Sequence, residues 1–211
     1  MKSKKHITIL FFAVIIIVPL VVFGAVNWYQ RSVAGLPHYG EKYAIEKSKP
    51  FFTVPDFQFI NQNGTTVDES FVKNKVWVAN FFFTSCPSIC PKMMSNLQTV
   101  QSAFAKSSDV RIISFSVDPE RDSAARLNTY AQARHINAGQ WQLATGRKKD
   151  LYQFARKGLS VVATDGDGGA EDFIHSDNLV LIDKDNHIRG YYDGTDAADT
   201  KRLIEDIKTL Q

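Results

Sequence analysis

Apolar positions change along the chain from a strand pattern to a helix pattern. Residues 76–83 form a near-continuous apolar run, as expected for a strand that is buried on both faces. After this run, Met93, Leu97, Val100 and Phe104 recur at helical spacing. The pattern therefore predicts a buried strand followed directly by an amphipathic helix.

The same patterns predict alternating strands and helices over the rest of the C-terminal part. An Asn-Gly turn at 61–64 favours a β-hairpin. The other predicted elements are strands at 57–60, 65–67, 110–117, 178–183 and 187–192, helices at 123–135 and 148–157, and a last helix from Thr195 or Asp196 to Leu210. With one more strand between the helices, the order is β-hairpin, β, α, β, α, β, α, β-hairpin, α. This order predicts an α/β fold with a central mixed sheet flanked by helices.

The N-terminal part has a different pattern. Residues 7–26 contain no charge and are long enough to cross a bilayer as a helix. Three lysines lie within residues 1–6, so the positive-inside rule predicts a cytoplasmic N-terminus and an external C-terminal part. A cleaved signal peptide is the competing interpretation, but the apolar run exceeds a usual signal-peptide core. We expect an uncleaved transmembrane anchor, a linker over 27–51 and one domain over 52–211.

The charge distribution follows this division. The first 31 residues hold four basic side chains and no acidic ones, and removing them from the formal net charge of +3 leaves −1. The basic character therefore belongs to the anchor, and the domain offers no electrostatic reason to expect nucleic acid as a partner.

The two cysteines of the chain, Cys86 and Cys90, follow the apolar run in the segment 84–91, Thr-Ser-Cys-Pro-Ser-Ile-Cys-Pro. Thiols four positions apart can project from one side of a helix's first turn, where the amide dipoles favour thiolate. Soft metal ions and disulfide exchange both use such a pair. A purely structural disulfide is disfavoured, because closing so short a loop removes little chain entropy.

Three motifs together resemble the Sco/SenC family. They are the segment 84–91, the segment 116–122 with the sequence Ser-Val-Asp-Pro-Glu-Arg-Asp, and His175 placed eight residues before Asp183. The resemblance covers roughly residues 52 to 211 and the anchor that precedes them. It implies a thioredoxin-like fold.

The resemblance also implies that Cys86, Cys90 and His175 bind copper. Two thiolates select Cu(I), and an added neutral imidazole allows Cu(II) as well. The resemblance further implies a role in supplying copper to, or reducing, the dinuclear copper (CuA) site of cytochrome c oxidase. The other four histidines adjoin the anchor, lie in the linker, end a helix or start an outer strand, and are assigned no role: His6, His38, His135 and His187.

Three further features of the sequence are candidates for a role in metal binding. Asp118 follows a strand and is predicted to support a metal ligand by hydrogen bonding, with a turn and helix-capping role as the alternative. Met93 and Met94 have thioether sulfurs that suit Cu(I), but core packing is the preferred interpretation. The acidic segment 165–172 fails the EF-hand pattern and is expected to be a loop.

Two functions remain open from the sequence. One is a metallochaperone, which is not an enzyme and whose partner is the copper-bearing subunit of the oxidase. The other is a thiol-disulfide oxidoreductase, with Cys86 and Cys90 as its catalytic residues and a periplasmic protein as its substrate. Either function would use a partner protein as thiol reductant, and both are expected on the periplasmic side of the inner membrane. His175 separates them, because metal binding uses it and disulfide exchange does not.

Overall fold

The structure is a computed structural model that describes residues 14–26, 35–40, 51–161 and 176–211. The chain divides into two units, residues 1–37 and 38–211. In the first unit, residues 14–26 are helical and every side chain in them is exposed. Among the described residues, no helix combines the length and apolarity that a membrane span requires. The predicted span begins at residue 7, outside the described residues, so the anchor stays a prediction.

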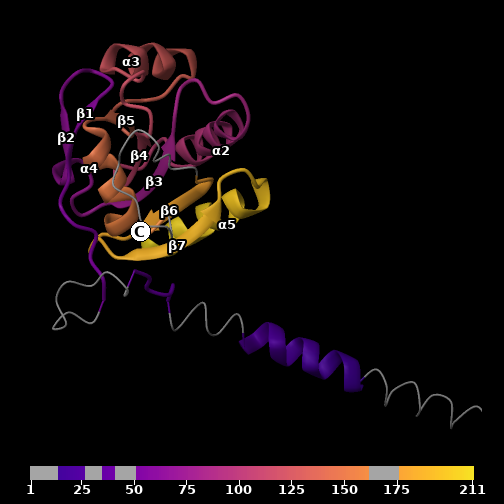
Figure 1. Cartoon of the computed structure of the whole chain (residues 1–211). Helices are drawn as coiled ribbons and strands as arrows, with labels where there is room; N and C mark the ends of the chain where they lie inside the picture. The colour runs from indigo at the N-terminus through magenta and orange to yellow at the C-terminus, as the bar shows by residue number, and fades with distance from the viewer. Residues whose placement is uncertain (1–13, 27–34, 41–50, 162–175) are drawn as a thin grey trace, which may run out of the picture. The chain divides into compact units, whose positions relative to one another are not determined.

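The second unit is built on a mixed sheet (Figure 1). Among the described residues it has seven strands in the order β2-β1-β5-β4-β3-β6-β7. The strands are β1 (Gln58–Asn61), β2 (Thr66–Asp68), β3 (Val76–Phe82), β4 (Val110–Ser116), β5 (Trp141–Thr145), β6 (Asn178–Ile182) and β7 (Ile188–Asp193). Strands β3, β4 and β5 are parallel, and the other pairs are antiparallel. The predicted central mixed sheet flanked by helices is confirmed.

The helices follow the predicted order, with one difference. They are α2 (Ile89–Ala103), α3 (Ala124–Ala133), α4 (Lys148–Gln153) and α5 (Ala197–Leu210), with a short 3₁₀ turn, η2, at Glu69–Phe71. The Ser123 side chain accepts a hydrogen bond at the start of α3, and Asp196 does so at the start of α5. The helix predicted over 148–157 is not continuous, because η3 (Phe154–Gly158) is a π-helical turn.

Strand β3 lies inside the sheet, between β4 and β6, and all seven of its residues are buried. Successive side chains point to opposite faces of the sheet. On one face, Phe81 stacks with Phe115 in a large aromatic cluster. On the other, Asn80 donates a hydrogen bond to the Met93 sulfur on α2. Met93 and Met94 are both fully buried, which agrees with the core-packing interpretation.

Part of the predicted linker belongs to the second unit. The Tyr39 amide donates to the Ile188 carbonyl at 3.0 Å, which makes an isolated bridge with β7. The Val54 amide donates to the Asn186 carbonyl at 2.8 Å, in the turn between β6 and β7. The Asn186 side chain in turn accepts from the indole of Trp77 at 3.2 Å. Residues 38–40 and 51–54 thus lie along the β6–β7 hairpin.

Candidate metal centre

The cysteines lie where two neighbouring parallel strands end. The register of β3 and β4 pairs Phe82 with Ser116, and the Val117 amide continues the pairing by donating to the Phe82 carbonyl at 2.9 Å. Parallel strands end at the same edge of a sheet. The segment that carries the cysteines therefore lies beside the segment 117–123 that leads into α3.

Cys86 and Cys90 occupy different positions at the start of α2. Cys90 is in the first turn, whereas Cys86 precedes the helix, so the prediction that both lie in the first turn is wrong for Cys86. The Cys86 amide donates to the Phe83 carbonyl at 3.2 Å, which closes a tight turn. The Cys90 amide points at the Cys86 sulfur at 3.5 Å. Both thiols are free and buried.

The surroundings of the two thiols shift their pKa values in opposite directions. Burial raises the pKa of Cys86, but hydrogen bonds from the Cys90 thiol and from backbone amides, including those of Ser88 and Ile89, outweigh burial and lower it. Amides at the start of a helix are donors without intrahelical partners, and they stabilise a thiolate. Burial and the hydrogen bond to Cys86 raise the pKa of Cys90 to about 12. Cys86 is therefore the more acidic of the two thiols.

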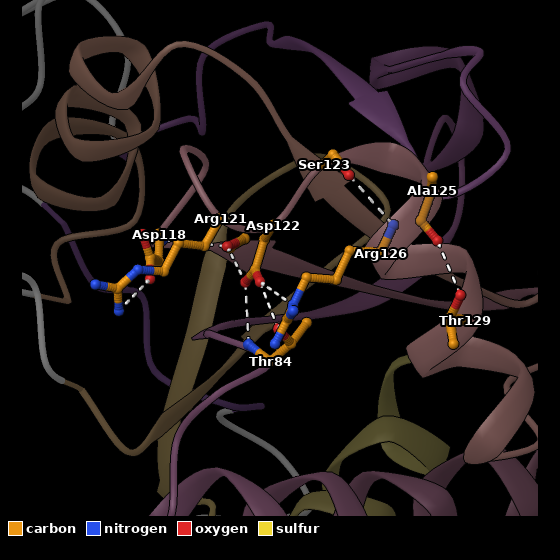
Figure 2. A network of polar contacts seen from close by, with 9 residues as sticks. Thr84, Asp118, Arg121, Asp122, Ser123, Ala125, Arg126 and Thr129 are labelled. Carbon is orange, nitrogen blue, oxygen red and sulfur yellow. Dashed lines mark hydrogen bonds and ion pairs between the residues drawn. The ribbon is translucent and has the colours of Figure 1, made fainter.

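A buried carboxylate holds the segment just before Cys86 (Figure 2). Asp122 is fully buried and accepts hydrogen bonds from the Thr84 amide at 3.0 Å and the Thr84 hydroxyl at 2.5 Å. The Ser116 hydroxyl donates to the same carboxylate at 2.6 Å. The Arg126 Nε lies 3.5 Å from Asp122 and donates to the Thr84 hydroxyl at 2.6 Å. One side chain thus links the cysteine segment to the end of β4 and the start of α3.

Asp118 has a weaker role in this arrangement. Its carboxylate faces Arg121 at 3.7 Å, and its carbonyl accepts the amides of Arg121 and Asp122. These contacts fit the turn interpretation, and the predicted support of a metal ligand by Asp118 stays a prediction. Asp122, which was not predicted from the sequence, is the residue that reaches the cysteine segment. The available signal was an acidic residue in the turn after β4, immediately before the Ser123 helix cap.

A tyrosine lies near the thiols. Burial, with a smaller contribution from the charges of Cys90 and Cys86, raises the pKa of Tyr130 to about 12, although the Arg134 guanidinium lowers it. Its ring lies 5.6 Å from that of Phe82, and the Arg134 guanidinium lies 4.8 Å from its centre. No sequence motif pointed to this residue.

Two predictions fall outside the described residues. They concern His175, the predicted third metal ligand, and the acidic segment 165–172. Both stay predictions.

Comparisons with known proteins find relatives in sequence and in fold. The SCO1/SenC family model matches residues 45–211. An SCO1 homologue of Bacillus subtilis is 32% identical over 160 residues, which cover 75% of this chain and 82% of the homologue. The structure of BsSco, a member of the Sco family of cytochrome c oxidase assembly proteins in which a disulfide switch was identified, is 32% identical with a TM-score of 0.64, covering 78% of this chain and 96% of BsSco.

A third match extends the fold similarity. Bradyrhizobium japonicum ScoI, solved with copper bound, is 23% identical with a TM-score of 0.61, covering 76% of this chain and 100% of ScoI. This match shows the fold. The family model covers most of the chain, and the B. subtilis homologue matches it at over 30% identity, so this chain belongs to the SCO1/SenC family.

Proposed function

We propose that this protein takes up one copper ion through the thiolates of Cys86 and Cys90, with His175 as third ligand. It then passes the ion to the CuA site on the copper-bearing subunit of cytochrome c oxidase. The observation that carries the proposal is the pair of free thiols at the start of α2, with the Cys86 sulfur against the helix amides. Family relatives that are cytochrome c oxidase assembly proteins, or were solved with copper, support it.

The two thiols contribute differently to copper uptake. Cys86 has the lowered pKa and offers the first thiolate, whereas Cys90 must lose its proton to the solvent as the ion binds. Two sulfur ligands suit Cu(I), and a histidine adds the nitrogen donor that Cu(II) prefers. The Asp122 carboxylate fixes the backbone at Thr84 and so restrains the approach of Cys86.

Metal titration of the reduced full chain tests the proposal. We expect one Cu(I) per chain, with tight binding abolished in Cys86→Ala and in Cys90→Ala, because a single thiolate leaves the ion under-coordinated. His175→Ala is expected to retain part of its Cu(I) affinity and to lose the Cu(II) thiolate absorption. His135→Asn is the matched control for a histidine change. Stoichiometric Cu(I) binding by a chain lacking both cysteines would refute the proposal.

Disulfide reduction is the second candidate function, and the unequal acidity of the thiols favours it. The Cys86 thiolate would attack one sulfur of a partner's disulfide and release the other as a thiolate. Cys90, once deprotonated, would then attack the Cys86 sulfur and release the second partner thiol. This closes a Cys86–Cys90 disulfide, so two electrons pass to the partner. A thiol reductant protein would restore the pair.

The oxidase activity of a strain that carries His175→Ala separates the two functions. The chaperone function predicts a loss of oxidase activity that added copper partly restores. The reductase function predicts near-normal oxidase activity, because thiolate attack requires no imidazole. Normal oxidase activity with an intact Cu(II) spectrum would remove His175 from the site.

We also propose that the chain is anchored in the inner membrane through residues 7–26, with the domain in the periplasm. The uncharged run and the three lysines before it support this orientation. Protease added to intact spheroplasts is expected to digest the domain. Protection of the domain until the membrane is lysed would refute the orientation.

A further inference from the structure

A second group of metal-binding side chains lies away from the cysteines. We propose that His38, Asp183 and His187 form a separate site for one divalent transition-metal ion of the Zn(II) or Cu(II) type. The proposal goes beyond the copper-transfer function and does not depend on it.

The separation of the three ligand atoms fits a metal ion. One nitrogen from each histidine and one carboxylate oxygen all lie within 4.8 Å of one another. The His187 Nδ1 and Asp183 Oδ2 atoms are 3.6 Å apart, too far for a good hydrogen bond. Metal–ligand bonds of about 2.0–2.1 Å in tetrahedral geometry put neighbouring ligand atoms about 3.3 Å apart. Small side-chain movements would therefore complete the coordination.

The three side chains are also held in place. The Asp183 carboxylate accepts the amides of Asp185 at 3.0 Å and of His187 at 2.9 Å. The His38 ring stacks on Phe51 at 3.6 Å and meets the His187 ring edge-on at 5.4 Å. Hydrogen-bonded carboxylates and fixed imidazole rings are usual around metal ligands. Two imidazoles and one carboxylate form a donor set that suits Zn(II) and Cu(II).

Arg189 is the group that opposes a cation at this site. Its guanidinium donates to the Asp183 Oδ2 atom at 2.7 Å. An incoming ion must share Asp183 with Arg189, so the affinity depends on both imidazoles.

The site is remote from the cysteines along β3. Trp77, near the start of β3, pairs with Ile182, the residue before Asp183. The cysteines follow the other end of the same strand. His38 comes from the segment before the sheet, so a bound ion would tie that segment to the β6–β7 turn.

The test uses the full chain in detergent, with Cys86→Ser, Cys90→Ser and His175→Ala removing the proposed copper ligands. We expect this protein to bind one Zn(II) in competition with a chromophoric chelator. His38→Ala and His187→Ala should each weaken binding roughly tenfold or more, since loss of even a ligand's hydrogen-bonding partner costs about 10–100-fold. His135→Asn is the matched control, because that residue is exposed and lies outside the group. Because the proposed copper ligands are absent, failure here does not affect the copper proposal.

Two further measurements guard against misfolded variants. The paramagnetic resonance spectrum of bound Cu(II) should show coupling to two imidazole nitrogens in the parent and to one in each histidine variant. Arg189→Gln removes the opposing charge and should tighten Zn(II) binding. Equal Zn(II) affinity in the parent and both histidine variants, or an unchanged Cu(II) spectrum, would overturn the proposal. So would weaker binding in an Arg189→Gln protein that keeps its parent's tryptophan fluorescence.

Discussion

Replacing Asp122 by Asn tests whether the buried carboxylate organises the cysteine segment. The change keeps the shape of the side chain and removes its charge. The Asp122 side chain is only 1% exposed, and its oxygens accept three hydrogen bonds, two from Thr84 and one from Ser116. With its oxygen in the place of Oδ2, the Asn side chain still accepts from the Thr84 amide and the Ser116 hydroxyl, but its NH2 group then faces the Thr84 hydroxyl, which must reorient.

The structure allows the size of the effect to be worked out. Hydrogen bonds to a charged group contribute about 1.5–3 kcal/mol each. Loss of the Asp122–Arg126 ion pair adds less than about 1 kcal/mol, because the Arg126 side chain that remains is half exposed. The Thr84 hydroxyl can turn and accept a hydrogen bond from the Asn NH2 group, which recovers part of this free energy. We expect a loss of about 2–4 kcal/mol in the free energy of unfolding, or roughly 5–15 °C in Tm for a domain of this size. Copper affinity should fall about 10–100-fold, as when a ligand's supporting group is lost.

Thermal unfolding of the full chain, followed by tryptophan fluorescence, measures the first effect. Trp77 and Trp141 are both fully buried and report on the sheet. Cu(I) competition measures the second effect. The matched control is Asp118→Asn, because the Asp118 carboxylate faces the largely exposed Arg121 at 3.7 Å. It should change stability by less than about 1 kcal/mol.

The comparison of these two variants decides the question. If Asp122→Asn matched Asp118→Asn in both stability and copper affinity, the network would have no organising role. If Asp118→Asn had the larger effect on copper affinity, Asp118 and not Asp122 would be the residue that supports the metal site, as the sequence predicted.

Three other measurements follow from the structure. Cys86 has the lowered pKa and Cys90 a pKa of about 12. Iodoacetamide at neutral pH, followed by mass spectrometry, should therefore modify Cys86 in the Cys90→Ser protein much faster than Cys90 in the Cys86→Ser protein. The rate at Cys86 should rise with pH until that thiol is fully ionised, and equal rates for the two cysteines would contradict the assignment. Asn186 has a φ of 61°, and its side chain accepts a hydrogen bond from Trp77. Asn186→Ala should therefore lower the free energy of unfolding, measured by chemical denaturation, by about 1–3 kcal/mol. Asn186→Gly should lower it less, because glycine adopts a positive φ without strain, and the reverse order would contradict this reasoning. Ser123→Ala should cost about 1 kcal/mol in the same assay, and no change would show that the cap contributes nothing.

The sequence predicted the elements whose signal is local. The apolar run at 76–83 corresponds to β3 at Val76–Phe82, because a strand buried on both faces needs apolar residues at nearly every position. Ser123 was recognisable as a helix cap from its type and place. The π turn Phe154–Gly158 was not predicted, because the helical pattern of that segment does not distinguish i+4 from i+5 hydrogen bonding.

The contacts around the candidate site depend on long-range pairing, so the sequence could not predict them. Asp118 and Asp122 lie in the same short motif, and only the β3–β4 register and the turn after β4 decide which one reaches Thr84. His38 and His187 are far apart in the sequence and were assigned to a linker and an outer strand. They come together because the segment at Tyr39 pairs with β7.

The bridge between Tyr39 and β7 also bears on self-association. β7 is the last strand of the sheet, and exposed edge strands pair readily with other chains and aggregate. The Tyr39 amide occupies the Ile188 carbonyl on that edge. A fragment beginning at residue 52 would lack this cover and offer a free edge to its neighbours. A soluble fragment for biophysical work should therefore begin before His38.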